Sequence, residues 1–581
     1  KVGGIHTVIS SKAGKMKENF KEYYAIGPYY ENKAQTEFEE KEVPEKFRKC
    51  FEELEKETGI KCRFGEWLIP GKNCHCILVE FNSIRPKINE IKRELWEKFR
   101  IDSLGTNGWF DEPVLWGRAV GMLIEKLVKA NVFNGVPAVA HFHEFLSGTG
   151  LLYLKEKNIP IKTVFTIHAT VLGRTIAESK RENLYDLIER GNKEKRSADN
   201  SLAYNYWAQA KHLLEKASAI NADCFTTVSA GVANEAEFIL GKKPDLITPN
   251  GLDMEQFPIM EEISILHRQN RDRIREFVEA YFSPYYYFDV NNTFVYFITG
   301  RREFHNKGID LFIDSLGELN RRLIHEKSEK TVVAFIWIAE EVTARNFNVM
   351  ENLAVYQMLE DAVEMETPKI KRALFETLIK GKHLKKADLF DEEFIENTKR
   401  IVLKFKRMPN ELPPISAFDV NENEITWAIK KNNLLNRKED KVKVIYYPTY
   451  LSPADGFIGL SYYAALTGGH LGVFPSYYEP WGYTPLETAA LGVPAVTTDF
   501  AGFGQFIEEK RKKKGGIIVL NRKEKPKEEV QELTRIMHSF CKKNRRERMR
   551  EKMHAKELAG LADWGSLIKE YSKAYACALK K

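Results

Sequence analysis

Two glutamates in residues 476–494 could take part in chemistry on a sugar phosphate. The segment reads SYYEPWGYTPLETAALGVP and places seven residues between Glu479 and Glu487. Thr484 and Pro485 are typical of the N-cap and first position of a helix, and Glu487 then takes the third position of a capping box. One interpretation is a structural cap beside an unrelated loop carboxylate. The other is a sugar-phosphate site, because helix N-termini attract phosphate.

Short apolar strands that alternate with helical stretches would position such groups. Continuous apolar strands of this kind predict parallel sheets covered by helices on both faces, with ligands at the carboxyl ends of the strands. The first unit has runs at residues 76–81, 138–142, 163–167, 224–228 and 246–248. The second has runs at residues 293–299, 332–339, 442–446, 472–475, 495–498 and 517–520. We expect two α/β units with the ligand site between them.

Histidines follow two strands of the first unit. The pair His141 and His143 could direct two imidazoles the same way and bind a metal, but no clear third ligand is apparent and we expect none to bind. His168 is the better candidate, since Gly173 and Arg174 follow it in a polar loop. The alternative is that His168 is a structural histidine.

Two further stretches could hold phosphate. Gly3 and Gly4, after Lys1, would let the backbone approach a ligand closely, although a paired glycine is often just a turn. A strand should precede that turn in a Rossmann-type unit, so we expect the natural N-terminus to lie upstream. Residues 300–308, GRREFHNKG, gather arginines and a lysine beside glycine after a strand, which is typical of a phosphate clamp. The alternative is a solvated surface turn.

Length and composition narrow the class of protein. A chain of 581 residues is too long for one core, and its 89 basic against 82 acidic residues give a net charge of only +7. This balance does not indicate nucleic-acid binding. No apolar run of about 18 residues and no signal peptide is present, so we expect no membrane association. Seven scattered cysteines without a Cys-x-x-Cys pair favour a reducing cytoplasm.

Two regions lie outside the strand pattern. Residues 257–290 are mixed in character and indicate an interdomain connection. Residues 340–440 are helical, with Ile370, Leu374 and Leu378 following Thr367-Pro368 at helical spacing. Amphipathic helices of this length need a partner surface, and we favour self-association over a third layer on the domain.

Five of these motifs, in this order, resemble glycogen synthases of the eukaryotic type. They are KVGGI, HFHE, TIHATVLGR, GRREFHNKG and residues 476–494, and the resemblance runs from Lys1 to about Trp564. It implies a GT-B fold, in which two Rossmann-like doubly wound domains face each other across a cleft. The implied domains are residues 1–256, with 562–581 packing back on them, and residues 257–561, including a helical insertion at about 340–440.

The resemblance also implies an activity. Such enzymes are retaining hexosyltransferases that move glucose from a nucleotide diphosphate glucose to the non-reducing end of an α-1,4-glucan such as glycogen. UDP-glucose is the favoured donor and ADP-glucose the alternative. No cofactor or metal is implied. The helical insertion resembles the region through which family members form tetramers, so a homo-oligomer, with a tetramer favoured, is expected in the cytoplasm.

Residue roles follow from the resemblance alone. It implies that Arg301 and Lys307 hold the diphosphate, while Glu479 and His168 lie at the transferred glucose. The catalytic residues are then Glu479, Arg301, Lys307 and His168. The other substrate-binding residues are Lys1, Gly3, Gly4, Arg174, Tyr462, Trp481, Gly482, Tyr483, Thr484 and Glu487. Among these, Tyr462 would stack on the nucleobase, and Glu487 would lie near the ribose.

The residue types suit this chemistry. Two fixed cations and a helix N-terminus can stabilise a departing diphosphate without a metal. A carboxylate such as Glu479 can stabilise oxocarbenium character on the sugar. Closure of two domains would exclude water and suppress hydrolysis. Retention through a covalent intermediate and retention by same-face attack both stay open.

Some positions depart from the family pattern. His6 stands where a tyrosine is usual, and only part of the family's glucose 6-phosphate-sensing arginine helix is kept, because His554 and Glu557 replace arginines. Regulation by that sugar phosphate therefore stays open. A catalytically inert glucan-binding scaffold on the same fold is a further alternative. A phosphorylase would need a recognisable lysine for pyridoxal phosphate, and none is found.

Overall fold

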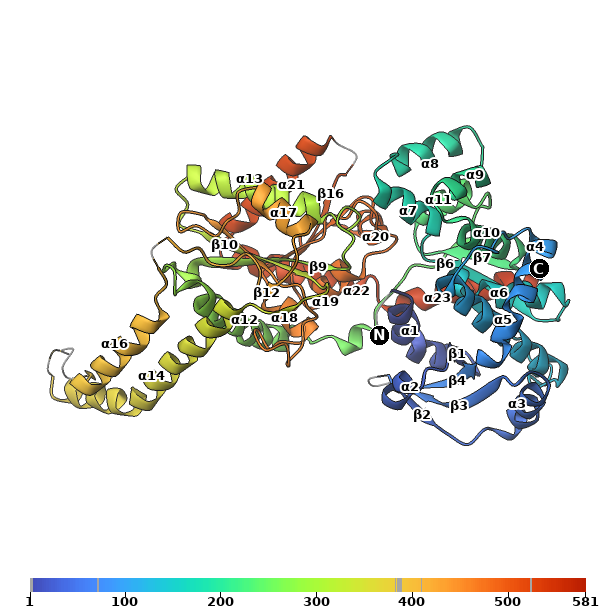
Figure 1. Cartoon of the computed structure of the whole chain (residues 1–581), viewed down its shortest axis with the longest axis horizontal. Coiled ribbons are helices and arrows are strands. Elements are labelled where there is room, and N and C mark those ends of the chain that lie inside the picture. Colours follow the sequence, from blue (N-terminus) through green and yellow to red (C-terminus); the bar gives the residue numbers. More distant parts are fainter. Residues whose placement is uncertain (1–3, 70–72, 382, 384–388, 409, 523–524) are drawn as a thin grey trace.

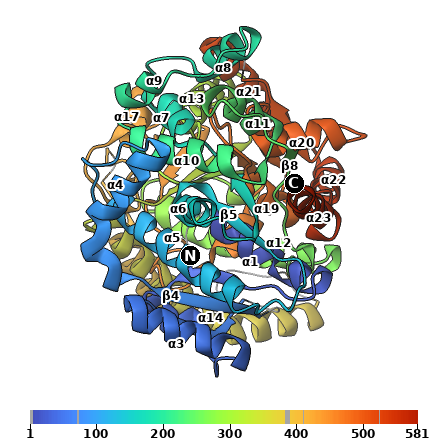
Figure 2. The same cartoon turned by 90° about the vertical axis from the view of Figure 1, so that its right-hand side faces the viewer.

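The computed structural model describes residues 4–69, 73–381, 383, 389–408, 410–522 and 525–581. The chain forms two lobes along one axis, and a helical arm projects from the far end of the second lobe (Figure 1). Seen along that axis, the first lobe lies in front of the second (Figure 2). Lys1 and Gly3, predicted to bind substrate, lie outside the described residues. No helix within those ranges is both long and apolar enough to span a bilayer.

The second lobe contains a six-stranded parallel sheet in the order β13-β10-β9-β14-β15-β16. In chain order this is the 3-2-1-4-5-6 arrangement of the Rossmann fold, which confirms the predicted doubly wound unit. Its strands are β9 (Thr293–Gly300), β10 (Thr331–Ile338), β13 (Val442–Tyr446), β14 (Leu471–Val473), β15 (Ala495–Thr498) and β16 (Ile517–Leu520). All eight residues of β10 are buried, as expected for an apolar strand covered on both faces.

Helices cover both faces of that sheet. They are α12 (Met260–Phe282), α13 (Ile309–His325), α17 (Glu424–Lys431), α18 (Tyr462–Gly468), α19 (Tyr483–Ala490), α20 (Gly502–Lys510), α21 (Pro526–Lys542) and α22 (Arg545–Gly560), with the 3-10 helix η3 (Val290–Asn292) before β9. The interpretation of residues 257–290 as a simple connection is wrong. Most of them form α12, because Ile274, Phe277 and Tyr281 recur at helical spacing and are buried in the lobe.

The first lobe contains a four-stranded parallel sheet in the order β5-β6-β7-β8. Its strands, all at predicted positions, are β5 (Val139–His143), β6 (Lys162–Ile167), β7 (Cys224–Thr227) and β8 (Leu246–Ile247). Its helices are α5 (Gly108–Lys129), α6 (Glu144–Glu156), α7 (Val171–Ser179), α8 (Leu184–Lys193), α9 (Asn200–Asn205), α10 (Gln209–Asn221) and α11 (Ala230–Ile239), followed by η2 (Met254–Gln256).

A second, mixed sheet of the first lobe has the order β1-β4-β3-β2. Its strands are β1 (Ala25–Pro28), β2 (Phe38–Glu40), β3 (Lys61–Trp67) and β4 (Cys74–Glu80), and its helices are α1 (Gly4–Asn19), α2 (Glu31–Glu37), α3 (Glu45–Thr58), η1 (Asn82–Lys87) and α4 (Ile88–Phe99). The predicted strand at 76–81 therefore belongs to β4, which pairs antiparallel with β3 rather than joining the parallel sheet. A cavity of about 1720 Å³ lies between the two sheets and is lined by β1, β4, β5 and α1.

The polypeptide crosses between the lobes twice, and the two crossings lie side by side. Leu252 N donates to Ala562 O at 2.9 Å, and Trp564 N donates to Leu252 O at 3.0 Å. After this point α23 (Trp564–Lys580) packs against the parallel sheet of the first lobe. The Trp564 indole is fully buried and donates to Ser11 Oγ of α1 at 2.7 Å. The last helix thus joins the first lobe.

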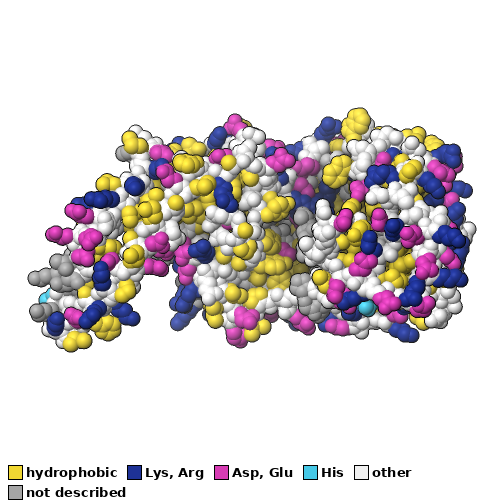
Figure 3. Space-filling view, turned by 60° about the horizontal axis from the view of Figure 1, so that its bottom comes forward, with side chains coloured by type: hydrophobic (Ala, Val, Ile, Leu, Met, Phe, Trp, Pro, Cys, Tyr) yellow, Lys and Arg dark blue, Asp and Glu magenta, His cyan; other side chains and the backbone are white. Residues whose placement is uncertain are grey.

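The described part of residues 340–440 is mainly helical, as predicted, and most of its helical residues build the arm. The arm consists of α14 (Phe347–Ile379) and α16 (Glu392–Phe405), above a short pairing of β11 (Ala344–Arg345) with β12 (Phe418–Asp419). Pro368 does not begin a helix but lies inside α14. Apolar side chains stand exposed along the arm, including Met365 at 79% and Ile379 at 82% (Figure 3).

Candidate functional site

Two adjacent strands of the second lobe bring the predicted cationic and acidic groups to one edge. The strand order reverses between β9 and β14, which pair in parallel. Arg301 follows the carboxyl end of β9, and the loop carrying Glu479 follows β14. Ligands of open α/β sheets bind at such a reversal, outside the carboxyl ends of the strands.

The loops after these two strands are in direct contact. Lys307 Nζ donates a hydrogen bond to Glu479 Oε2, and Ser476 Oγ lies 3.4 Å from the same oxygen. The side chains of Lys307 and Glu479 are only 17% and 15% exposed. Gly308 has a φ of 68° and packs against the Pro475 carbonyl, where a Cβ would overlap the oxygen. A glycine is therefore required for this close approach.

The arginine pair after β9 divides into two roles. Arg302 Nε lies 3.2 Å from Glu340 Oε2 and forms an ion pair. Arg301 is exposed, and its guanidinium forms no ion pair with any residue in the described part of the chain. Arg301 is therefore the arginine that an anionic ligand could engage.

The predicted capping box at α19 is wrong. The N-cap is Gly482, not Thr484, and its φ of 115° is open to glycine but not to side-chain-bearing residues. No side chain caps the helix. Glu487 instead accepts hydrogen bonds from the hydroxyls of Tyr462 (3.0 Å) and Tyr463 (3.1 Å). The first turn of α19, with Tyr483 and Thr484, is thus left without a capping carboxylate and can face an anion.

Glu487 is buried beside two tyrosines. Burial raises the pKa of its carboxyl to about 7, although both tyrosine hydroxyls act in the other direction. The rings of Tyr462 and Tyr463 lie 5.3 Å apart at their centroids, and Tyr463 is 44% exposed. Tyr462, predicted to stack on the nucleobase, and Glu487, predicted to lie near the ribose, are therefore neighbours.

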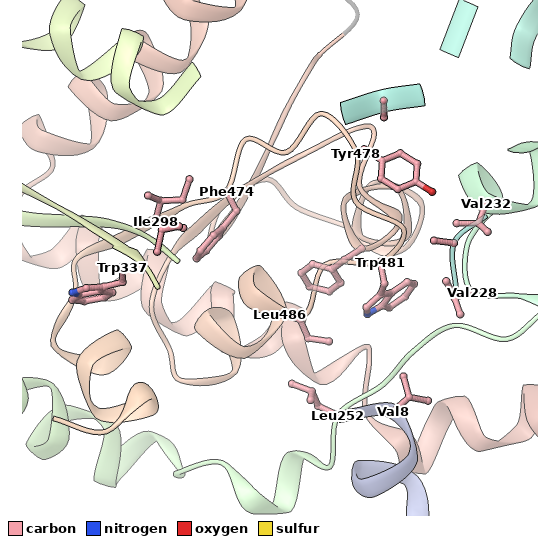
Figure 4. Packing of buried hydrophobic residues seen from close by; sticks show 14 of the residues in the cluster. Val8, Val228, Val232, Leu252, Ile298, Trp337, Phe474, Tyr478, Trp481 and Leu486 are labelled. Atoms are coloured by element: carbon pink, nitrogen blue, oxygen red, sulfur yellow. The ribbon is translucent and has the colours of Figure 1, made fainter. Parts of the chain in front are cut away.

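Trp481 has a packing role in this loop. Its indole is 3% exposed and lies 5.6 Å from the ring of Phe506. Figure 4 shows Trp481 and Tyr478 on the side of the second lobe that faces Val228 and Val232 of the first. The indole thus packs against Phe503 and Phe506 of α20, and its part in substrate binding stays a prediction.

Two histidines at the carboxyl ends of neighbouring strands of the first lobe share a hydrogen bond. His143 Nδ1 lies 3.1 Å from His168 Nε2. Burial, with a smaller contribution from nearby Lys12, lowers the pKa of His168 to about 3, so the ring is neutral. His141 is hydrogen-bonded through Nδ1 to Tyr575 Oη (3.0 Å) and through Nε2 to Thr166 Oγ1 (2.7 Å). Across the residues that the structure describes, no group of three or more His, Cys, Asp or Glu is arranged to hold a metal.

Arg174 connects the first lobe to the second. Arg174 lies on α7, six residues after His168. Its Nη1 lies 3.2 Å from Glu303 Oε1 in the loop after β9. Its guanidinium carbon is 5.8 Å from the centre of the Tyr478 ring. Burial lowers the pKa of Arg174, but Tyr478, Glu303 and Glu144 outweigh this and raise it, so the guanidinium is charged.

Two carboxylates at this interface were not among the predicted site residues. Glu144 has a φ of 55°, which is strained for a glutamate, and burial raises its pKa to about 7 despite Arg174 and Arg301. Glu303 pairs with Arg174 through one oxygen, and the other oxygen is buried. Both stand in motifs with functional neighbours, HFHE and RREFHNK, which is the only signal that could have identified them.

Of the predicted residues, Arg301, Lys307 and Glu479 are gathered at one sheet edge, and Arg174 reaches them from the other lobe. Tyr462 and Glu487 form a pair on the flank of α19. Gly4 is the first residue of α1, whose N-terminal end lies at the boundary between the lobes (Figure 1).

Known proteins match this chain over its whole length. A sequence profile for the family described as "Glycogen synthase" matches residues 1–581. The glycogen [starch] synthase of Neurospora crassa is 34% identical, with 100% of this chain and 82% of the relative covered. The liver glycogen [starch] synthase of Homo sapiens is 33% identical, with 100% and 82% covered, and isoform 1 of Saccharomyces cerevisiae is 34% identical, with 100% and 84% covered.

Among solved structures, the catalytic domain of starch synthase IV from Arabidopsis thaliana, bound to ADP and acarbose, is similar in fold. The TM-score is 0.52 at 13% sequence identity, and the alignment covers 100% of this chain and 97% of that one. This likeness confirms the α/β GT-B fold, and at such low identity it carries nothing further.

Proposed function

The chain belongs to the glycogen synthase family, and on that premise we propose that it transfers glucose from UDP-glucose to the non-reducing end of glycogen or a related α-1,4-glucan. Membership makes it a retaining glycosyltransferase. The observation that supports the proposal most is the meeting of Lys307 and Glu479 at the strand reversal of the second lobe, opposite Arg174 of the first.

The donor diphosphate would lie between the first turn of α19 and the loop after β9. Backbone N–H groups of Tyr483 and Thr484 carry the positive end of the helix dipole, and Arg301 and Lys307 add two formal charges. These groups oppose the charge that grows on the diphosphate as it leaves, so they act most strongly in the transition state. Tyr462 would stack on the base, with Glu487 at the ribose.

The glucose would lie between Glu479 and the first lobe. The bond from C1 to the diphosphate oxygen breaks with its electron pair leaving on UDP, and the acceptor 4-hydroxyl oxygen bonds to C1 while its proton passes to the released UDP. Once the diphosphate engages Lys307, the Glu479 carboxylate can stabilise positive charge at C1. His168 is neutral, so it would position a sugar hydroxyl by hydrogen bonding rather than by charge.

The donor assignment is tested by direct competition. Purified protein is given glycogen as acceptor and either UDP-glucose or ADP-glucose, and glucan-bound glucose is measured. We expect kcat/KM to be at least about tenfold higher with UDP-glucose, roughly the discrimination available to one or two well-placed contacts. Faster transfer from ADP-glucose would reassign the donor. Glycogen binding without turnover of either donor would favour the inert scaffold.

The same proposal covers organisation and location. The domains would be residues 1–256 and 257–561, with residues 562–581 on the first, which the paired crossings at Leu252 and Ala562 support. Exposed apolar side chains on the arm support a homo-oligomer, with a tetramer favoured. All seven cysteines are free thiols, which supports a cytoplasmic location.

A further inference from the structure

A buried carboxylate connects the two halves of this site. Glu235 lies on α11 of the first lobe and is 4% exposed. Its Oε1 accepts three hydrogen bonds: from Thr170 N at 2.9 Å, from Thr170 Oγ1 at 2.6 Å and from Tyr478 Oη at 3.0 Å. The first two donors belong to the first lobe and the third to the second. One oxygen atom therefore joins elements of both lobes.

On the first-lobe side, Glu235 holds the turn that carries the sugar-facing residues. Thr170 is the N-cap of α7 and lies between His168 and Arg174. A second buried carboxylate, Glu215, accepts from Val171 N at 3.0 Å, so two carboxylates hold the start of α7. Gly173 is needed here, because a Cβ would lie 2.6 Å from Glu235 Oε1. The orientation of this turn therefore depends on where Glu235 lies.

On the second-lobe side, the third donor belongs to the loop of the proposed catalytic carboxylate. Tyr478 directly precedes Glu479 and is 3% exposed. Its backbone N–H donates to Asn306 O at 3.1 Å, beside Lys307. Figure 4 shows the Tyr478 hydroxyl directed towards the first-lobe segment that carries Val232, a residue of α11. The Tyr478 ring is thus fixed to the Lys307–Glu479 loops at its backbone and to Glu235 at its hydroxyl.

We propose that Glu235 is a positioning residue that couples closure of the lobes to the alignment of the His168–Arg174 turn against Glu479. This role rests on the proposed function for the identity of the aligned groups. With the Tyr478 hydroxyl in place, Glu235 Oε1 has its full set of donors and Thr170 is held. Without that hydroxyl the Glu235 carboxylate lacks its contact with the second lobe. The His168–Arg174 turn is then no longer held in a fixed position relative to the Glu479 loop.

Tyr478→Phe is the cleanest test, because it removes one oxygen and keeps the buried ring. We expect kcat to fall about ten- to a hundredfold, the size of effect expected for losing a hydrogen bond to a charged group. The donor KM should change less than about threefold, since the uniform binding contacts remain. Glu235→Ala removes the acceptor oxygen itself and should lose at least as much, and the double variant should lose little more than Glu235→Ala alone, because Tyr478→Phe removes nothing further once the acceptor is gone.

Tyr477→Phe is the matched control. The Tyr477 hydroxyl also crosses between the lobes, to Asn183 Oδ1 at 3.2 Å, but it does not contact the α7 turn. It should keep kcat within about twofold. An unchanged kcat in Tyr478→Phe, or an equal loss in Tyr477→Phe, would overturn the proposal. A loss of thermal stability in Tyr478→Phe with kcat intact would reduce Glu235 to a structural role and overturn it too.

A second readout does not depend on glucose transfer. Amide hydrogen exchange at Thr170 and Gly173 reports the α7 turn directly, and we expect it to rise about tenfold in Tyr478→Phe, with or without UDP. If wild-type protein transfers no glucose but exchange still rises, the proposed function fails and the coupling stands. If transfer occurs and exchange is the same in both proteins, the coupling fails and the function stands.

Discussion

The Lys307 ammonium is hydrogen-bonded to the Glu479 carboxylate, although the two residues follow different strands of the same sheet. Each group neutralises the other while no ligand separates them. A diphosphate carries more negative charge than one carboxylate and is the stronger partner for the lysine. Donor binding would therefore release Glu479 where positive charge develops on the sugar, so that each half of the pair meets the ligand group of opposite charge.

Glu479→Gln should abolish this function while leaving the fold. We expect kcat for glucose transfer to fall at least about a hundredfold, in the range measured for removing one electrostatic stabiliser from a transition state. The thermal midpoint should move by only a few degrees, because the amide can still accept from Lys307. Glu366→Gln on the arm is the control, since it removes a carboxylate from the exposed pair with Lys369. Near-normal transfer by Glu479→Gln would refute the assignment.

Arg301→Ala and Arg302→Ala should differ, although the residues are adjacent. Arg301 is free to meet the diphosphate, whereas Arg302 is engaged with Glu340. We expect Arg301→Ala to lower kcat/KM for UDP-glucose about a hundredfold or more, and Arg302→Ala to lower it less than about fivefold. Steady-state kinetics on both variants decides this. A larger loss in Arg302→Ala would mean that the roles are exchanged.

His168 should be neutral throughout the working pH range. Its pKa is lowered to about 3, mainly by burial, so it carries no charge at any pH above about 5. We expect ¹⁵N-detected imidazole shifts of the neutral form between about pH 5 and pH 8. His168→Gln, which keeps hydrogen-bonding capacity, should give a pH–rate profile of unchanged shape. Loss of an acidic or basic limb in that variant would contradict a neutral role.

Much of the second lobe could be predicted because its strands carry their own signal. The continuous apolar runs of β9 and β10 imply burial on both faces, and the polar loop after β9, which gathers arginines and a lysine beside glycine, implies a ligand edge. The resemblance then supplied the residues that meet there. The prediction of a helix cap was wrong. The Thr-x-x-Glu pattern at Thr484 predicts a capping box, but Gly482 is the N-cap of the helix. Glu487 accepts hydrogen bonds from Tyr462 and Tyr463 instead.

Tertiary partners explain the other misses. The residues around Glu235 in the sequence give no indication of its hydrogen bond with Tyr478, because the two residues are 243 positions apart and meet only when both lobes are folded. The ion pair of Glu303 likewise could not be predicted from its neighbours in the sequence, because its partner, Arg174, lies on the other lobe. The antiparallel pairing of β4 could not be foreseen, since an apolar run does not specify the direction of its neighbour.

Stability should fall as pH rises through the window set by Glu487. Burial raises its pKa from 4.5 to about 7, so between these values the unfolded chain releases a proton that the folded chain keeps. The folded state therefore loses roughly 3 kcal/mol of stability across that window and none below it. Glu487→Gln cannot ionise, so its thermal midpoint relative to wild type should rise between about pH 5 and about pH 8. If the thermal midpoints of the two proteins changed with pH in the same way, the raised pKa of Glu487 would be contradicted.

The arm should mediate assembly through its exposed apolar face. Met365 and Ile379 on α14 are 79% and 82% exposed. The helix α14 itself lies far from the lobe boundary (Figure 1). Burying such a side chain against another copy contributes about 1.5–3 kcal/mol, so Met365→Asp with Ile379→Asp should weaken association by several orders of magnitude.

Sedimentation velocity should then show a particle near the 67.1 kDa monomer, with glucose transfer per subunit within about threefold of wild type. Lys371→Asp, an exposed polar site of the same helix, should leave assembly intact. If the double variant sediments as wild type does, the arm is not the interface. If wild-type protein is itself a monomer at all concentrations, self-association through the arm is refuted outright.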